Sequence, residues 1–142
     1  MPDPAEQLYG QFILFKSDQR AAPRGWNVET LGGWTLASHP KLPAHAIHTN
    51  DGHVGWLIGF AADLGGALVT TDVHWRDDAQ VEESIYRYGG RFACVIITPQ
   101  LARLYLDPCG SLAAVYSIDR PIVGSTSTVR SSPRSQKRFS VL

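Results

Sequence analysis

Short apolar runs separated by glycine, proline and polar residues dominate the hydrophobic pattern of this chain. Runs of this kind predict β-strands bounded by turns. We expect seven to nine strands, drawn from Tyr9 to Lys16, Trp26 to Val28, Trp34 to Leu36, Ala44 to Thr49, His53 to Ala61, Phe92 to Ile97, Leu101 to Leu106, Ala113 to Tyr116 and Ile122 to Gly124. In the fifth of these, Gly55 and Gly59 indicate bulges or positions where another backbone comes close.

One segment has helical periodicity instead. Asp77 or Asp78 can cap the helix, and Gln80 follows Asp77 by three residues, as in a capping box. Gly89 fits the position after the helix, where glycine takes a positive φ at little cost. One face carries the less polar side chains of the segment, namely Val81, Ser84, Ile85 and Tyr88.

The stretch after the helix is the most specific in the chain. Phe92 to Ile97 is apolar at every position, which is typical of a strand buried on both faces. After the next strand comes Asp107-Pro108-Cys109-Gly110, which predicts a β-turn in which the aspartate binds backbone amides. Many strands and one helix predict an α+β domain dominated by antiparallel sheet.

The composition of the chain indicates the extent of the domain, the kind of partner and the cell compartment. Of 142 residues, 44% are hydrophobic, which fits one domain over residues 1–129. Residues 130–142 carry four basic residues, no acid and no periodicity, which predicts a disordered tail. Without those four, nine basic residues face 13 acidic ones, so the body has a net charge of −4. This argues against nucleic acid as the main partner, and the absence of a signal peptide, membrane span or disulfide framework favours a cytoplasmic protein.

Residues from about 52 to 129 resemble the N-terminal domain of asparagine synthetases, a class II glutamine amidotransferase. The resemblance lies in the order of a helix, a Gly-x-Phe-Ala strand, a hairpin, an Asp-Pro-x-Gly turn and two short strands. These motifs appear as Gly90-Arg91-Phe92-Ala93, Leu106-Asp107-Pro108-Cys109-Gly110, Ala114-Val115-Tyr116 and Ile122-Val123-Gly124-Ser125. The resemblance implies an N-terminal-nucleophile hydrolase sandwich, with two antiparallel sheets between helical layers.

The residues that the family's glutaminase chemistry requires are not in place. The family uses an N-terminal cysteine whose own amine is the base, but residue 2 is Pro2. The family's Asn-Gly-Glu-Ile-Tyr-Asn motif supplies an oxyanion donor. Its best match, Ile58 to Asp63, has Ile58 in place of the asparagine and Phe60 in place of the glutamate. Losing one oxyanion donor typically costs about 10²–10³ in rate. We therefore expect a catalytically degenerate domain, with no catalytic residue, cofactor or metal.

The resemblance also implies a partner. In relatives such as β-lactam synthetases and lasso-peptide cyclases, which serve natural-product biosynthesis, the substrate itself supplies the amine. An ATP-dependent synthetase domain with a Ser-Gly-Gly-x-Asp-Ser loop then forms the amide. This chain has no such loop, so we expect it to act as a scaffold for such a domain on another polypeptide. Exposed strand edges also favour a homo-oligomer.

Two other functions stay open. A hydrolase or glutaminase could use Cys109, or Pro2 as an N-terminal amine. A peptide- or protein-binding module could use an exposed aromatic surface, because the chain has four tryptophans. They are Trp26, Trp34, Trp56 and Trp75.

Histidines raise the question of a metal site. His45, His48 and His53 lie close in sequence, with Asp51 as the nearby acid. However, residues 45 and 48 of one strand point to opposite faces, and no further ligand stands at metal-binding spacing. We expect these three side chains to be ordinary surface or loop histidines, and Cys94 to be a packed thiol.

Overall fold

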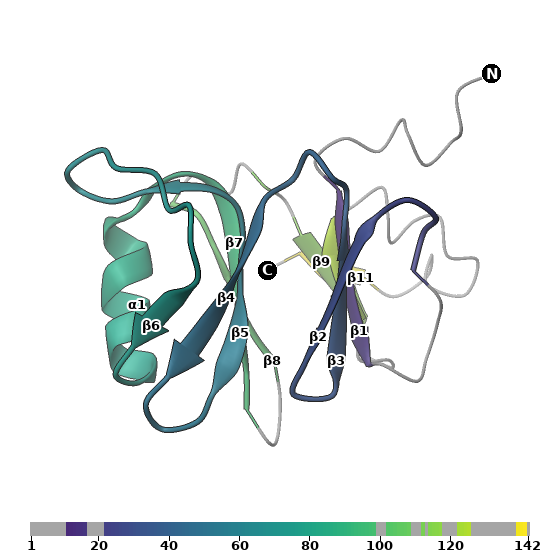
Figure 1. The fold of residues 1–142 in the computed structure, drawn as a ribbon, viewed down its shortest axis with the longest axis horizontal. Helices are drawn as coiled ribbons and strands as arrows, with labels where there is room; N and C mark the ends of the chain where they lie inside the picture. The colour runs from purple at the N-terminus through teal and green to yellow at the C-terminus, as the bar shows by residue number, and fades with distance from the viewer. Residues whose placement is uncertain are drawn as a thin grey trace. The chain divides into compact units, whose positions relative to one another are not determined.

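The computed structural model describes residues 11–16, 22–98, 102–108, 112, 114–117, 122–125 and 139–141. These residues form eleven strands in two sheets and one α-helix, which confirms an α+β protein with mostly β-structure (Figure 1). The chain divides into two compact units, Met1–Leu42 with Ala113–Leu142, and Pro43–Leu112. Each unit has its own sheet and is described by itself.

The first unit holds a six-stranded sheet in which every pair of neighbours is antiparallel. The order is β11-β9-β10-β1-β3-β2, with β1 at Phe12–Lys16, β2 at Asn27–Leu31, β3 at Trp34–Ser38, β9 at Ala114–Ser117, β10 at Ile122–Ser125 and β11 at Phe139–Val141. Gly32 and Gly33 both have positive φ between β2 and β3, as a two-residue hairpin turn requires. Ile13, Trp26 and Ala37 belong to its buried core.

Strand β11 differs from the expectation drawn from the sequence. Phe139–Val141 pairs antiparallel with β9, within the segment 130–142 for which the sequence predicts no regular structure. An apolar, polar, apolar triplet is enough for a short strand when a partner edge is present. The remaining residues of that segment lie outside the described part of the chain.

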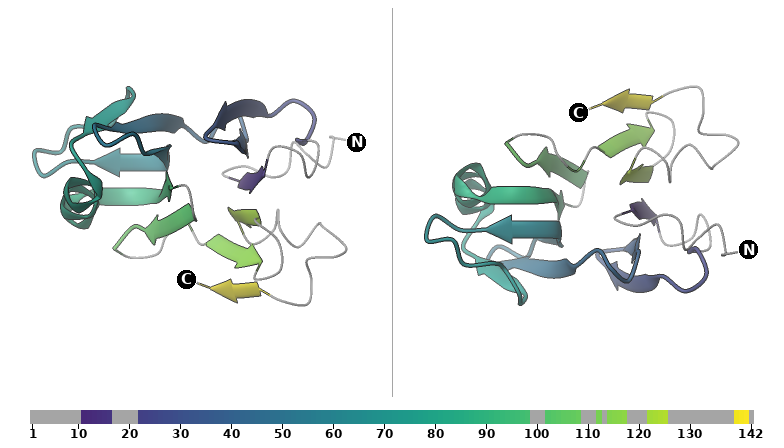
Figure 2. Two further views of the ribbon diagram at one scale, coloured as in Figure 1. Left: turned by 90° about the horizontal axis from the view of Figure 1, so that it is seen from below. Right: turned by 90° about the horizontal axis from the view of Figure 1, so that it is seen from above.

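The second unit holds a five-stranded sheet with one helix on it. The order is β6-β4-β5-β7-β8, with β4 at Ala44–Thr49, β5 at Val54–Ala62, β6 at Val73–Trp75, β7 at Gly89–Ile97 and β8 at Ala102–Leu106. Helix α1 covers Asp78–Arg87. The expectation of antiparallel sheets is wrong for one pair of strands, because β6 runs parallel to β4. The chain leaves β5, passes β4 and returns along its outer edge before α1 begins (Figure 2).

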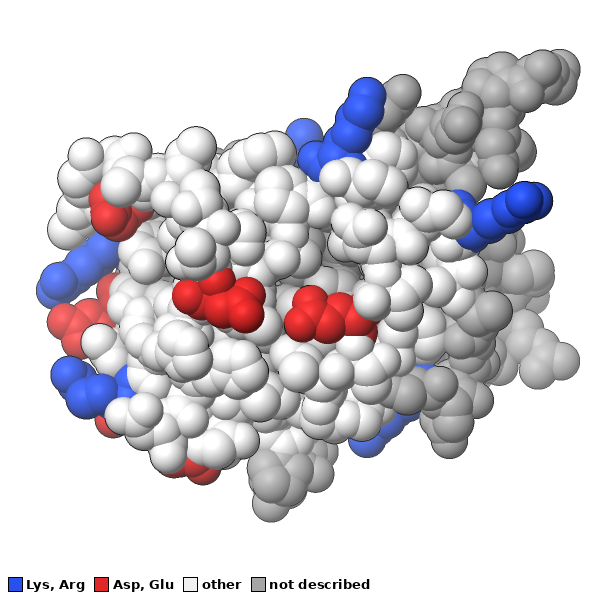
Figure 3. All heavy atoms as spheres, in the orientation of Figure 1, with Lys and Arg blue, Asp and Glu red and all other residues white. Residues whose placement is uncertain are grey.

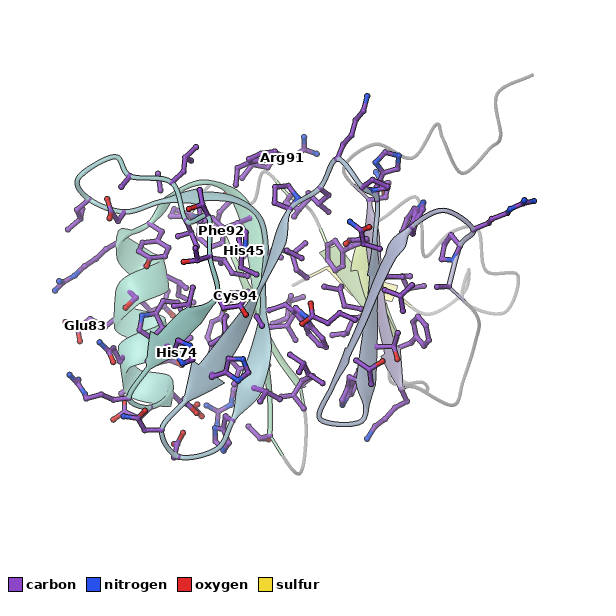
Figure 4. The ribbon with its side chains drawn as sticks, in the orientation of Figure 1. His45, His74, Glu83, Arg91, Phe92 and Cys94 are labelled. Carbon is purple, nitrogen blue, oxygen red and sulfur yellow. The ribbon has the colours of Figure 1, made fainter. Side chains whose placement is uncertain are left out.

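Helix α1 covers one face of this sheet. Val81 and Ile85 of α1 belong to one buried core cluster with alternate residues of β5 and β7. Figure 4 shows two of these, Phe92 and Cys94, on the side of β7 that faces the helix. Every residue from Phe92 to Ile97 is buried, as its uniformly apolar sequence predicts.

Glycines let β5 and β7 approach each other closely. A Cβ on Gly55 would lie 1.9 Å from the carbonyl oxygen of Val95, and one on Gly59 would lie 2.3 Å from that of Arg91. The prediction of close backbone approach at Gly55 and Gly59 is confirmed. The pairing runs without interruption from Val54↔Ile97 to Ala62↔Gly89, so neither glycine marks a bulge.

The start of α1 follows the sequence prediction, and its end does not. The side chain of Asp77 accepts a hydrogen bond from the Gln80 amide at 2.9 Å, so Asp77 is the N-cap. The Gln80 side chain accepts from the amide of Arg76 at 2.7 Å, rather than from that of Asp77 as a capping box would require. The expected positive φ at Gly89 is wrong: it occurs at Gly90 (φ 123°), because the chain passes directly from Tyr88 into β7.

Candidate functional site

The β4–β5 turn presents polar side chains at one end of the five-stranded sheet. The amide of Thr49 donates to the carbonyl oxygen of His53 at 2.9 Å, and the amide of Gly52 donates to that of Thr49 at 3.1 Å. Gly52 has a φ of 90°, which a side chain would make costly. These bonds fix the turn, so Asp51 and His53 project from a defined backbone.

The parallel β4–β6 pair brings the start of α1 beside this turn. Thr49 lies in register with Trp75, and the amide of Asn50 donates to the carbonyl oxygens of Trp75 and Arg76 at 3.0 and 3.1 Å. Two residues later α1 begins at Asp78. The first turn of the helix therefore lies against the β4–β5 turn, although 25 residues separate His53 from Asp78.

Asp78 connects three elements through its two carboxylate oxygens. Its Oδ1 lies 2.8 Å from Nδ1 of His53, and its Oδ2 lies 3.4 Å from a guanidinium nitrogen of Arg103 on β8. The side chains of His53 and Asp78 are 24% and 23% exposed, so this pair is shielded but open to solutes. Chemically, the carboxylate orients the imidazole and offers a negative site next to a nitrogen donor.

Asp51 completes a group of three possible metal ligands. The hydroxyl of Thr49 donates to Oδ1 of Asp51 and accepts from the amide of His53 at 2.9 Å. The hydrogen bond from Thr49 lowers the pKa of Asp51 below its ordinary value. One donor atom from each of Asp51, His53 and Asp78 lies within 4.8 Å of the other two.

A second polar contact lies farther along the helix. The Tyr105 hydroxyl on β8 donates to a carboxylate oxygen of Glu82 at 2.9 Å. Burial, reinforced by this hydrogen bond, raises the pKa of Tyr105 to about 12. With the Arg103–Asp78 contact, it ties the outer strand β8 to α1.

A shallow groove of about 540 Å³ runs along α1 on the side that carries Gln80, Glu83 and Arg87. Its lining is Asp63, Leu64, Gly65, Arg76, Gln80, Glu83, Ser84, Arg87 and Tyr88. Arg87 and Glu83 form an ion pair at 3.2 Å within this lining. Figure 3 shows acidic and basic side chains interspersed at the edge of the molecule where Figure 1 places α1. Opposite charges this close to each other do not select a ligand of one sign.

The residues that the sequence analysis weighed for glutaminase chemistry are only partly described. Pro2 and Cys109 lie outside the described residues. Ile58 is fully buried in the middle of β5, paired with Ala93 of β7, whereas Phe60 is 50% exposed. Cys94 is fully buried, and burial raises the pKa of its thiol far above the ordinary value, so the thiolate needed for attack is not formed.

The histidines and tryptophans are placed as follows. His45 and His48 lie in β4 on opposite faces. His48 stacks on His74 of β6 with ring centroids 5.3 Å apart. Of the four residues considered as metal ligands, His53 and Asp51 come together, whereas His45 and His48 do not join them. Their neighbours Asp78 and Arg103 are not predicted from the sequence. All four tryptophans are buried and provide no exposed aromatic surface.

Comparison of the chain with protein-family models, with curated proteins and with solved structures gave no match. Among the described residues, no helix is long and apolar enough to cross a membrane.

Proposed function

We propose that this chain is a catalytically degenerate glutamine amidotransferase-like domain of the N-terminal-nucleophile hydrolase type, and that it serves as a scaffold for an ATP-dependent amide-forming synthetase. The support is the order of a capped helix, an apolar Gly-x-Phe-Ala strand, a hairpin and an Asp-Pro turn, all within one unit. Asp107 in this turn is 4% exposed and accepts from the amides of Phe92 and Leu112 at 3.1 and 3.3 Å.

The observation that best supports the proposed lack of glutaminase activity is the position of Ile58. Its side chain is fully buried in a continuously paired strand, and it has no group that donates a hydrogen bond. A developing oxyanion at this position would meet hydrocarbon instead of an amide donor.

An ammonia-release assay with L-glutamine tests the proposal. The full chain should release no more ammonia than buffer, and Cys109→Ala should give the same trace. Turnover that Cys109→Ala abolishes would assign the chain to the hydrolases and overturn the scaffold function. The partner is tested by co-purification with a neighbouring gene product that carries a Ser-Gly-Gly-x-Asp-Ser loop, and a stable complex is expected.

A further inference from the structure

We propose that Asp51, His53 and Asp78 form a binding site for a divalent transition-metal ion, with Zn²⁺ as the best match. This site is independent of the proposed scaffold function. It uses one nitrogen and two carboxylate ligands, which come from the β4–β5 turn and from the first turn of α1.

The spacing of the donor atoms fits a small metal ion. Around a tetrahedral Zn²⁺ with bonds of about 2.0–2.1 Å, donor atoms lie about 3.4 Å apart. His53 Nδ1 and Asp78 Oδ1 are 2.8 Å apart, so they need only a small separation. No donor pair exceeds 4.8 Å. Asp51 is exposed, and an ion that draws its carboxylate closer to the other two ligands has to displace the hydrogen bond from Thr49.

The proposed metal ion would bind between His53 Nδ1 and Asp78 Oδ1, where a hydrogen bond now joins the two side chains. His53 Nδ1 and Asp78 Oδ1 are 2.8 Å apart. An imidazole nitrogen and a carboxylate oxygen this close need a shared proton, because both atoms otherwise repel as acceptors. A bound cation bonds to both atoms, and the displaced proton passes to Nε2 of the imidazole or to solvent.

Residues around the ligands restrict their motion. The Thr49 hydroxyl donates to the Asp51 carboxylate and accepts from the backbone amide of His53, so it holds the turn from which both ligands project. The backbone bonds from Asn50 to Trp75 and Arg76 hold the turn against the segment that leads into α1. Three protein ligands leave a fourth position for water or a solute.

The nitrogen donor selects the class of metal. Mg²⁺ and Ca²⁺ prefer all-oxygen sites, whereas imidazole combined with carboxylates suits Zn²⁺ and its neighbours. Arg103 opposes binding, because its guanidinium lies 3.4 Å from Asp78 Oδ2. The two carboxylates and this one cation still leave a net charge of −1 when His53 is neutral, which favours a divalent ion.

Isothermal titration of the tag-free full chain with ZnCl₂ tests the site. We expect one saturable site per chain, weakened at least about tenfold by His53→Gln and by Asp78→Asn. His45→Gln and His74→Gln are matched controls in the same sheet and should bind as the parent does. Arg103→Gln should tighten binding roughly three- to tenfold, because it removes a nearby positive charge.

Thermal unfolding distinguishes a variant that has lost a metal-binding side chain from a variant that does not fold. Zn²⁺ should raise the Tm of the parent chain and of His45→Gln, because it binds only the folded state, and it should leave His53→Gln unshifted. If Asp78→Asn does not fold, Asp51→Asn at the exposed turn replaces it, with the same loss expected. Absence of saturable binding, equal affinity of His53→Gln and parent, or weaker binding by Arg103→Gln would overturn the proposal.

Discussion

Asp107 and Phe92 bind each other in both directions across the β7–β8 hairpin. The amide of Phe92 donates to Oδ2 of Asp107, and the amide of Asp107 donates to the carbonyl oxygen of Phe92, both at 3.1 Å. The same carboxylate oxygen accepts from the amide of Leu112 at 3.3 Å. One buried side chain thus fixes where the apolar part of β7 begins and where the chain goes after β8.

Removing this carboxylate should be costly. Asp107→Ala leaves the buried amides of Phe92 and Leu112 without their acceptor, and each lost partner costs about 1–3 kcal/mol. We expect urea unfolding to show a loss of about 3 kcal/mol in the free energy of unfolding. Asp63→Ala is the control, because Asp63 also accepts from two amides, those of Gly65 and Ala67, but in an exposed turn. Equal losses for the two variants would contradict this role.

The close approach of β5 and β7 predicts a steric effect at Gly55. A methyl group there would lie 1.9 Å from the Val95 carbonyl oxygen, so the strands must separate. Gly55→Ala should lower the free energy of unfolding by at least about 2 kcal/mol. Gly89→Ala lies in the same strand pair, meets no atom within 4 Å, and should change that free energy by less than about 0.5 kcal/mol. A neutral Gly55→Ala would show that the strands are not this close.

Tyr105 predicts a loss of stability at high pH. Its pKa is raised from 10.0 to about 12 in the folded chain, so the folded state favours the neutral phenol. The stabilisation is therefore complete below about pH 10 and is lost as the pH rises toward about 12. Urea unfolding at about pH 9 and about pH 11 should show a larger decline for the parent than for Tyr105→Phe. Tyr86→Phe, at a side chain that is 72% exposed, serves as control and should decline as the parent does.

Local patterns in the sequence predicted the local elements of the fold. Ala44 to Thr49 is expected as a strand and forms β4 with the same bounds, and Asp77 caps α1 as its spacing to Gln80 predicts. The pattern does not predict the short strand β6, because an alternation over only three residues is too short to distinguish a strand from a loop. The sequence predicts a positive φ at Gly89, whereas Gly90 adopts it. Two glycines follow one another after the helix, and the sequence does not distinguish between them.

The candidate site could not be predicted from the sequence, because its residues are distant along the chain and meet only in the folded sheet. The sequence indicates that Asp78 lies at the start of a helix and that His53 is one of several histidines. No motif or spacing in the sequence connects these two residues. They meet because β6 pairs parallel to β4 and so delivers the start of α1 to the β4–β5 turn. Arg103 reaches Asp78 only through the position of β8 in the sheet. Such a cluster depends on strand order, which spacing along one chain does not encode.

The assay of glutamine hydrolysis tests the central claim most directly. With Ile58 fully buried in β5, the full chain should release ammonia from L-glutamine at the rate of buffer alone, and Cys109→Ala should not change that rate. Glutamine turnover by the full chain that is lost in Cys109→Ala would contradict the account.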